Sequence, residues 1–363
     1  MILGVIVFYL YFCRHKQFDQ LTFYIDEGTK FFRQAPFKPR PPSGSPEGEG
    51  PPPNLPEGRL PEKLYKSLPL GGAGGGPRFG GGPSSNERQM SMIANGKYRH
   101  TYTVTASDIT PQYRLTPNAM LMYFQDSFAR LMTIHNVAAF DIVKQRRMWV
   151  ITEVRIDIQP TVTYWSEHFT VELWVSEMTS LRIYCDFRII RGDNEQLIAS
   201  GTSQWNILNL DTKRLEPTDF LAEKLQVVPE LMTDSHKKVR FPKPQAFDMQ
   251  MEHRVTRLDL DFNYHVSNRS YVSIALLTMP EEVMATQTVA SLSVHWLHET
   301  YLADILTCRM SRTDNGCYLH TLTNAEGVTV CELMSRWQQQ PETADVSEEL
   351  SRIDMTERSR TTS

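Results

Sequence analysis

Cysteine is scarce in this chain, which has five among its 363 residues and no C-x-x-C pair. The odd number leaves at least one thiol without a disulfide partner, so we interpret all five as reduced residues in a non-oxidising compartment. An excess of positive charge is also absent. The formal net charge of -4 argues against general nucleic-acid binding.

A long apolar run is missing as well. The apolar start, residues 1–13 (MILGVIVFYLYFC), is shorter than the roughly 20 residues that cross a bilayer. It lacks the basic start and the small-residue cleavage site of a signal peptide. We predict that residues 1–33 are an apolar targeting or anchoring segment, with membrane association through residues 1–13. An exposed terminus without such a role is the alternative.

Two further segments lack apolar periodicity. Residues 34–96 are rich in proline and glycine and are predicted to be a disordered linker. Residues 339–363 are polar and charged and are predicted to be a disordered tail. The sequence between them is long enough, and the chain apolar enough at 40% hydrophobic residues, for about two domains.

The first folded unit is predicted over residues 97–228. Thr116-Pro117 has the cap and first-turn pattern of a helix start. One strand is expected before this helix, at residues 99–106, and others after it, at residues 149–159, 168–176, 181–191 and 196–210. A helix followed by a run of antiparallel strands indicates an α+β fold.

The second unit, residues 247–338, contains the most informative stretch, residues 258–268. If this stretch is an extended strand, its side chains alternate between two faces. One face would be apolar, with Leu258, Leu260, Phe262 and Tyr264. The other would be polar, with Asp259, Asp261, Asn263 and His265. Ser267 or Asn268 would cap a following helix that Pro280 closes, and strands are expected at 286–299, 305–311, 317–322 and 328–336.

The two units resemble each other when the sequence is slid against itself without gaps. Val104-Thr105 then falls on Val255-Thr256, and Asp108 falls on Asp259. A repeat this long indicates a duplicated domain rather than a solenoid. The recurrence of Asp259 as Asp108 indicates a structural role for both. The second copy is the better candidate for chemistry, because the first has Thr110, Gln112 and Arg114 in place of Asp261, Asn263 and His265.

Residues 259–268, D-L-D-F-N-Y-H-V-S-N, closely resemble the D-L-D-x-N-x-H-V-x-N motif of the acyl-acyl carrier protein thioesterases of plants and bacteria. Met148-Trp149-Val150 and Glu172-Leu173-Trp174 resemble the first-domain signature of that family. The resemblance implies a tandem hot-dog fold, in which each unit has a helix wrapped by a curved antiparallel sheet. It also implies hydrolysis of the thioester between a fatty acyl chain and the phosphopantetheine arm of acyl carrier protein, which ends chain elongation.

The resemblance places Asp261, Asn263, His265 and Glu299 in the active site. Glu299 with His265 is the candidate pair that activates water, and Asn263 could donate a hydrogen bond to the thioester carbonyl or hold the water. Asp261 could orient a neighbour or attack directly as a nucleophile, and both roles stay open. Plant members carry a cysteine where this chain has Thr300, so a thiolate cannot act there. We expect no metal ion and no organic cofactor.

The acyl chain is expected in the apolar interior of the first unit, beside its helix. The candidate substrate-binding residues are Met120, Met122, Phe124, Met132 and Trp149, and core packing is the alternative for each. Acyl carrier protein is acidic, so a basic patch should receive it. The candidate patches are Lys144, Arg146 and Arg147, or Lys237, Lys238 and Arg240. The tandem pair could act alone, or two chains could form a homodimer.

Two other functions stay open. One is an acyl-coenzyme A thioesterase with the same fold. The other is a non-catalytic acyl-binding or scaffold protein at a membrane. The family suggests a plastid or the bacterial cytoplasm, whereas residues 1–13 indicate an organelle or a membrane reached through an apolar segment.

Overall fold

The computed structural model describes residues 91–340 apart from residues 164–165, 193–194 and 245. The predictions for residues 1–33, for residues 34–90 of the linker and for residues 341–363 of the tail lie outside the described residues. Within this described part, no helix is both long enough and apolar enough to cross a membrane.

The first unit follows the predicted order of one helix and several strands. Residues Ser91–Ala94, which the linker prediction included, form strand β1, because Asn95 and Gly96 adopt positive φ angles and turn the chain back onto β2. The elements that follow are β2 (Lys97–Thr103), α4 (Pro117–Ile134), α5 (Ala139–Ile142), β3 (Arg147–Ile158), β4 (His168–Met178), β5 (Ile183–Arg191), β6 (Gln196–Asn209) and β7 (Leu215–Glu216).

The second unit repeats this plan with a shorter helix. Its elements are β8 (Met249–Arg254), α6 (Asn268–Leu276), α7 (Glu281–Thr286), β9 (Gln287–Trp296), β10 (Ile305–Arg312), β11 (Tyr318–Thr323) and β12 (Thr329–Gln339). The strands predicted at the C-terminal end of the chain are confirmed to within a few residues. The strand predicted at residues 258–268 is wrong, because the strand of this unit that precedes the helix is β8.

The strands of both units form one antiparallel sheet. Its order is β1-β2-β4-β5-β6-β3-β9-β12-β11-β10-β8, with β7 paired to β6. The units meet where β3 pairs with β9, from Glu153 opposite His295 to Asp157 opposite Ser291. The observed combination of a few helices with an antiparallel sheet confirms the α+β prediction.

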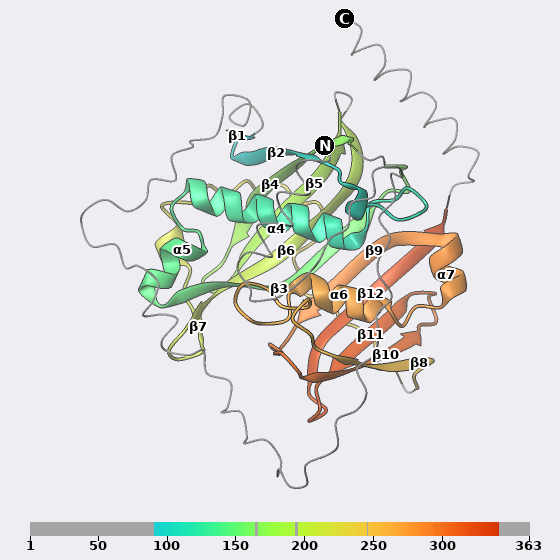
Figure 1. The fold of residues 1–363 in the computed structure, drawn as a ribbon. Coiled ribbons are helices and arrows are strands. Elements are labelled where there is room, and N and C mark those ends of the chain that lie inside the picture. Colours follow the sequence, from blue (N-terminus) through green and yellow to red (C-terminus); the bar gives the residue numbers. More distant parts are fainter. Residues whose placement is uncertain (1–90, 164–165, 193–194, 245, 341–363) are drawn as a thin grey trace, which may run out of the picture. The chain divides into compact units, whose positions relative to one another are not determined.

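Both long helices begin at residues that the sequence indicates. The Thr116 hydroxyl accepts the Ala119 N–H at 3.1 Å at the start of α4, and the Ser267 hydroxyl accepts the Ser270 N–H at 3.1 Å at the start of α6. Figure 1 shows α4 lying across the strands of the first unit and α6 across those of the second. The two helices contact each other, and the Asn118 amide donates to the Ser273 hydroxyl at 2.5 Å.

The segment that connects the units, residues 229–248, crosses the sheet. Near its start the Met232 N–H donates to the buried Asp186 carboxylate at 2.7 Å. Arg155 of β3 then donates to the Ser235 carbonyl at 2.6 Å, and Ser311 of β10 donates to the Ala246 carbonyl at 2.8 Å. The connection is therefore hydrogen-bonded to strands of both units.

Candidate active site

Residues 255–267 form a compact loop rather than the predicted strand. The Asp261 N–H donates to the His265 carbonyl at 2.8 Å, and the Tyr264 N–H donates to the Asp261 carbonyl at 3.1 Å. Tyr264 lies at a φ of 64°, in the left-handed region, which an extended strand does not contain. The chain therefore reverses between Asp261 and His265, and the alternation in the sequence does not correspond to two faces.

The exposure of the side chains agrees with this correction. Leu258 is 95% exposed, Phe262 74% and Tyr264 54%, although the strand interpretation places all three on an apolar packed face. Leu260 alone among the four packs its side chain against the core, and its backbone pairs with Val266 in an isolated bridge. Asp261, Asn263 and His265 therefore lie near one another because they belong to one turn, and not because they share one face of a strand.

His265 and Glu299 lie together. Their closest atoms, His265 Nδ1 and Glu299 Oε1, are 3.6 Å apart, with the two side chains 18% and 42% exposed. Glu299 belongs to the loop after β9, which is held against the first loop because the Val266 N–H donates to the Thr300 carbonyl at 2.9 Å. A half-buried imidazole beside a solvent-accessible carboxylate can take a proton from water.

Asp261 and Asn263 lie in the same turn as His265. The Asp261 carboxylate accepts the backbone N–H of Asn263 at 2.7 Å, which closes the turn. The side-chain amide of Asn263 makes no hydrogen bond to any described residue, so its N–H groups are available to a bound substrate. The Asp261 carboxylate is therefore hydrogen-bonded to the backbone of the loop and not to the His265 ring or the Asn263 amide.

Asp259 holds the base of the loop. Its carboxylate accepts the Thr256 N–H at 2.7 Å and the Thr256 hydroxyl at 2.8 Å, and it lies 3.1 Å from His253 Nε2. Burial alone would raise the pKa of Asp259, but the hydrogen bonds from Thr256 and His253 outweigh it and lower the pKa. These contacts bear out the structural role predicted for Asp259.

Two neighbours of Glu299 in the sequence do not join it. The Thr300 side chain is buried and lies 2.7 Å from the Tyr271 hydroxyl. His295 is buried in β9, where its ring stacks on Phe241 with centroids 4.2 Å apart. Burial, together with the positive charges of Lys238 and Arg155, lowers the pKa of His295 to about 4. Among the described residues, no group of three His, Cys, Asp or Glu side chains is arranged to hold a metal ion.

The five residues predicted to bind the acyl chain pack into the core of the first unit. Met120, Phe124 and Met132 on α4 are almost completely buried, and Met122 packs against the same core from a partly buried position. The Phe124 ring stacks on Phe187 with centroids 4.7 Å apart. The Trp149 indole donates to the Val137 carbonyl at 2.8 Å. Each side chain therefore has a packing role in this structure.

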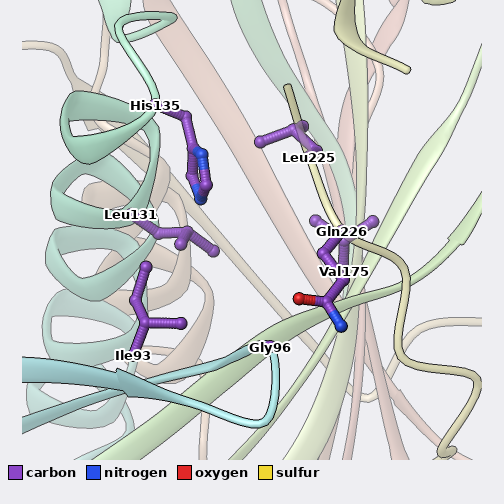
Figure 2. Close-up of a pocket in the computed structure, with 7 residues that line it drawn as sticks. All are labelled: Ile93, Gly96, Leu131, His135, Val175, Leu225 and Gln226. Carbon is purple, nitrogen blue, oxygen red and sulfur yellow. The ribbon is translucent and has the colours of Figure 1, made fainter. Parts of the chain in front are cut away.

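A small pocket of about 30 Å³ lies at the C-terminal end of α4. Figure 2 shows Leu131 of α4 and His135, the residue after the helix, facing the segment of Leu225 and Gln226, with Ile93 and Gly96 at one end and Val175 beside Gln226. Burial lowers the pKa of His135. Sequence reasoning missed these residues, because they come from four separate segments and no spacing pattern joins them.

The predicted basic patches differ in their pairing. Arg146 pairs with Asp211 at 2.6 Å, and Arg147 pairs with Glu216, so most of the positive charge of the first patch is neutralised. Lys237, Lys238 and Arg240 are exposed on the connecting segment, with no carboxylate of the described residues within ion-pair distance. The second patch is the better candidate surface for an acidic partner.

Comparison with known sequences identifies both units. The sequence profile of the acyl-ACP thioesterase N-terminal domain matches residues 95–223, and that of the C-terminal domain matches residues 243–339. A chloroplastic acyl-[acyl-carrier-protein] hydrolase of Cuphea viscosissima is 23% identical over 265 residues, 68% of this chain and 63% of the relative. A chloroplastic oleoyl-acyl carrier protein thioesterase of Arabidopsis thaliana is 25% identical over 56% of each chain. The chain thus spans less than two thirds of these relatives.

Solved structures share the fold. An acyl-ACP thioesterase from Bacteroides thetaiotaomicron superposes with a TM-score of 0.61 and 16% identity, over 67% of this chain and 98% of that one. A 12:0-ACP thioesterase from Umbellularia californica gives a TM-score of 0.61 and 17% identity, over 68% of this chain and 99% of that one. The tandem hot-dog prediction is confirmed by this likeness.

Proposed function

The chain belongs to the acyl-acyl carrier protein thioesterase family, and we propose that it hydrolyses the thioester of a fatty acyl chain carried on acyl carrier protein. The observation that carries the proposal is the proximity of His265 and Glu299, at 3.6 Å, in loops that also contain Asp261 and Asn263. Free fatty acid and the carrier with its free thiol are the products.

The positions of these groups support the following reaction. Glu299 and His265 together take a proton from a water molecule as its oxygen attacks the thioester carbonyl carbon. The Asn263 amide donates to the carbonyl oxygen as negative charge develops on it. The carbon–sulfur bond then breaks, and the thiol of the carrier leaves with a proton. Asp261 keeps the loop closed through the Asn263 N–H, an interaction that a nucleophilic role would interrupt.

We propose that the acyl chain lies beside α4. The N-terminal end of α4 contacts α6, which follows the candidate catalytic loop, while the pocket of Figure 2 lies near Leu131 and His135. These ends are separated by about 20 Å at 1.5 Å per helical residue, a length comparable to a long fatty acyl chain. A Leu131→Phe substitution would fill the pocket, and we expect it to shift the preference toward shorter chains.

Hydrolysis by the full chain tests the proposal. Acyl carrier protein and coenzyme A thioesters of the same acyl chain are compared, with His265→Ala and Glu299→Ala run beside the unchanged chain. We expect faster turnover of the carrier protein substrate and a loss of about 10²–10⁴-fold in each variant. Equal or faster turnover of the coenzyme A ester would favour the acyl-coenzyme A thioesterase. Bound acyl chains without turnover of either ester would leave a binding protein.

We propose a plastid as the compartment, on the ground that the plant relatives named above are chloroplastic. Residues 1–33 are the candidate targeting segment. Fusion of residues 1–96 to a fluorescent protein tests this in plant or algal cells. Plastid fluorescence is the expected result, and fluorescence at another membrane or throughout the cytoplasm would contradict it.

A further inference from the structure

The side chains of His265 and Glu299 are not hydrogen-bonded to each other. The distance of 3.6 Å between His265 Nδ1 and Glu299 Oε1 is longer than a hydrogen bond. The Glu299 side chain is 42% exposed and lies beyond the end of β9 at Trp296. The His265 ring makes no hydrogen bond to any described residue. A flexible carboxylate in this position needs another contact if it is to stay beside the imidazole.

Tyr301 contacts both groups. Its hydroxyl donates to Glu299 Oε2 at 3.0 Å, and no other described side chain is hydrogen-bonded to that carboxylate. Its ring meets the His265 ring edge to face, with centroids 5.0 Å apart and an interplanar angle of 90°. The backbones of Tyr301 and His265 also pair in an isolated antiparallel bridge. One residue therefore limits the position of both candidate groups.

The backbone of Tyr301 is itself fixed. Its N–H donates to the Asp304 carboxylate at 2.8 Å, and the Asp304 N–H donates back to the Tyr301 carbonyl at 3.2 Å. The Ala303 N–H donates to the Val255 carbonyl at 3.0 Å, which ties this turn to the base of the catalytic loop. Burial, and then the nearby Glu299 charge, raise the pKa of Tyr301 to about 12. The hydroxyl consequently keeps its proton at neutral pH and can act as a donor.

We infer that Tyr301 is a positioning residue of the proposed hydrolysis, holding the Glu299 carboxylate through its hydroxyl and the His265 imidazole through its ring. This inference rests on the proposed function. Sequence reasoning missed Tyr301, because the motif that carries the family resemblance ends at Asn268 and the resemblance in the later segment concerns only Glu299 and Thr300. The residue acts on Glu299 and His265 and needs no contact with the substrate.

Tyr301→Phe separates the two contacts, because it removes the hydroxyl and keeps the ring. We expect kcat to fall about tenfold, the size expected for one hydrogen bond to a charged group, with KM changed less than about twofold. The Glu299 carboxylate also loses the Tyr301 hydroxyl, a hydrogen-bond donor that stabilises its ionised form. The acidic limb of the profile of kcat/KM against pH should therefore move to higher pH. Tyr301→Leu removes the ring as well and should lower kcat further.

Tyr113→Phe is the matched control. It removes a hydroxyl from the partly exposed tyrosine that occupies the same position in the first copy, where that hydroxyl makes no hydrogen bond to a described residue. It should leave kcat and the pH profile unchanged. The ring-nitrogen signals of His265, followed by NMR, give a readout without turnover, and they should shift in Tyr301→Leu but not in Tyr113→Phe.

Two results would overturn the inference. One is a Tyr301→Phe enzyme with unchanged kcat and an unchanged acidic limb. The other is a Tyr301→Leu protein in which the His265 signals do not move, although its melting temperature shows that it is folded. Failure of the proposed function can be told apart from failure of this inference. Unchanged hydrolysis in Glu299→Ala, or no hydrolysis by the unchanged chain, would contradict the proposed function whatever the tyrosine variants do.

Discussion

Residues 104–116 and residues 255–267 have the same backbone structure with different chemical groups on it. In both copies a threonine N–H donates to an aspartate carboxylate at 2.7 Å, from Thr105 to Asp108 and from Thr256 to Asp259. In both, a tyrosine stands at positive φ, 57° in the first copy and 64° in the second. The residue that caps the helix donates its N–H to that aspartate's carbonyl at 2.8 Å in each copy.

The copies differ at the positions that could react. The first has Thr110, Gln112 and Arg114 where the second has Asp261, Asn263 and His265. The loops after β3 and β9 also correspond, because Ser166 donates to Val104 and Ala303 donates to Val255, both at 3.0 Å. Four residues earlier, the first copy has Val162 and the second has Glu299. The comparison teaches that a few residues fix the path of the loop and leave the others free to change.

The largest expected effect comes from putting a residue of the first copy into the second. His265→Arg should lower kcat/KM on an acyl carrier protein substrate by about 10²–10⁴-fold, because arginine cannot take a proton from water beside Glu299 as the imidazole is proposed to do. The melting temperature should change little, since the imidazole makes no hydrogen bond to a described residue. Gln112→Asn, which puts an Asn263-like residue into the first copy, is the control and should leave activity unchanged. More than a tenth of the original activity in His265→Arg would contradict the comparison.

The next effect concerns the helices. The ungapped self-comparison places Phe124 of α4 on Ala275 of α6. Phe124→Ala should lower the free energy of unfolding by about 3–5 kcal/mol, because a fully buried ring stacked on Phe187 is removed. Urea denaturation measures the change. Phe140→Ala on α5, where the ring is 75% exposed, is the control and should stay within about 0.5 kcal/mol. Similar losses in both variants would count against a core role for Phe124.

A smaller effect should depend on pH. The pKa of Asp259 is lower in the folded chain than in the unfolded one, so its contribution to stability is fully present above the unfolded value of about 4. The contribution is lost as pH falls through the folded pKa. Asp259→Ala should cost about 1–3 kcal/mol at pH 7, because the Thr256 donors lose their acceptor.

Unfolding at several pH values between 7 and 3 measures this effect. The difference in the free energy of unfolding between the unchanged chain and Asp259→Ala should shrink toward the acid end. A difference that stays constant over the range would show that the Asp259 charge does not stabilise the second loop.

The sequence predicted most of the fold from local signals. Thr116-Pro117 marked the start of α4, Ser267 marked the start of α6, and the apolar strands lay within a few residues of their predicted places. It failed at residues 258–268, where alternating polar and apolar residues resembled a strand. Tyr264 at positive φ and the Asp261 side chain bonded to the Asn263 N–H produce a turn that periodicity alone does not reveal.

For the candidate site, the family resemblance indicated both His265 and Glu299, which the structure brings together, but it did not give their geometry. The closeness of Glu299 to His265 depends on the pairing of two loops more than 30 residues apart. The contacts of Tyr301 depend on side-chain direction, and the pocket beside Leu131 depends on four segments meeting in space. Sequence patterns over neighbouring residues contain none of this information.

The most direct test of the central claim, that His265 and Glu299 act as one unit in the second copy, is a double-mutant cycle. The hydrolysis rates of the unchanged chain, His265→Ala, Glu299→Ala and the double variant are compared on one acyl carrier protein substrate. If the two groups act together, the double variant should lose about as much activity as the more severe single variant, because the second removal has nothing left to disrupt. Losses that multiply in the double variant, or single variants that keep the original rate, would contradict the claim.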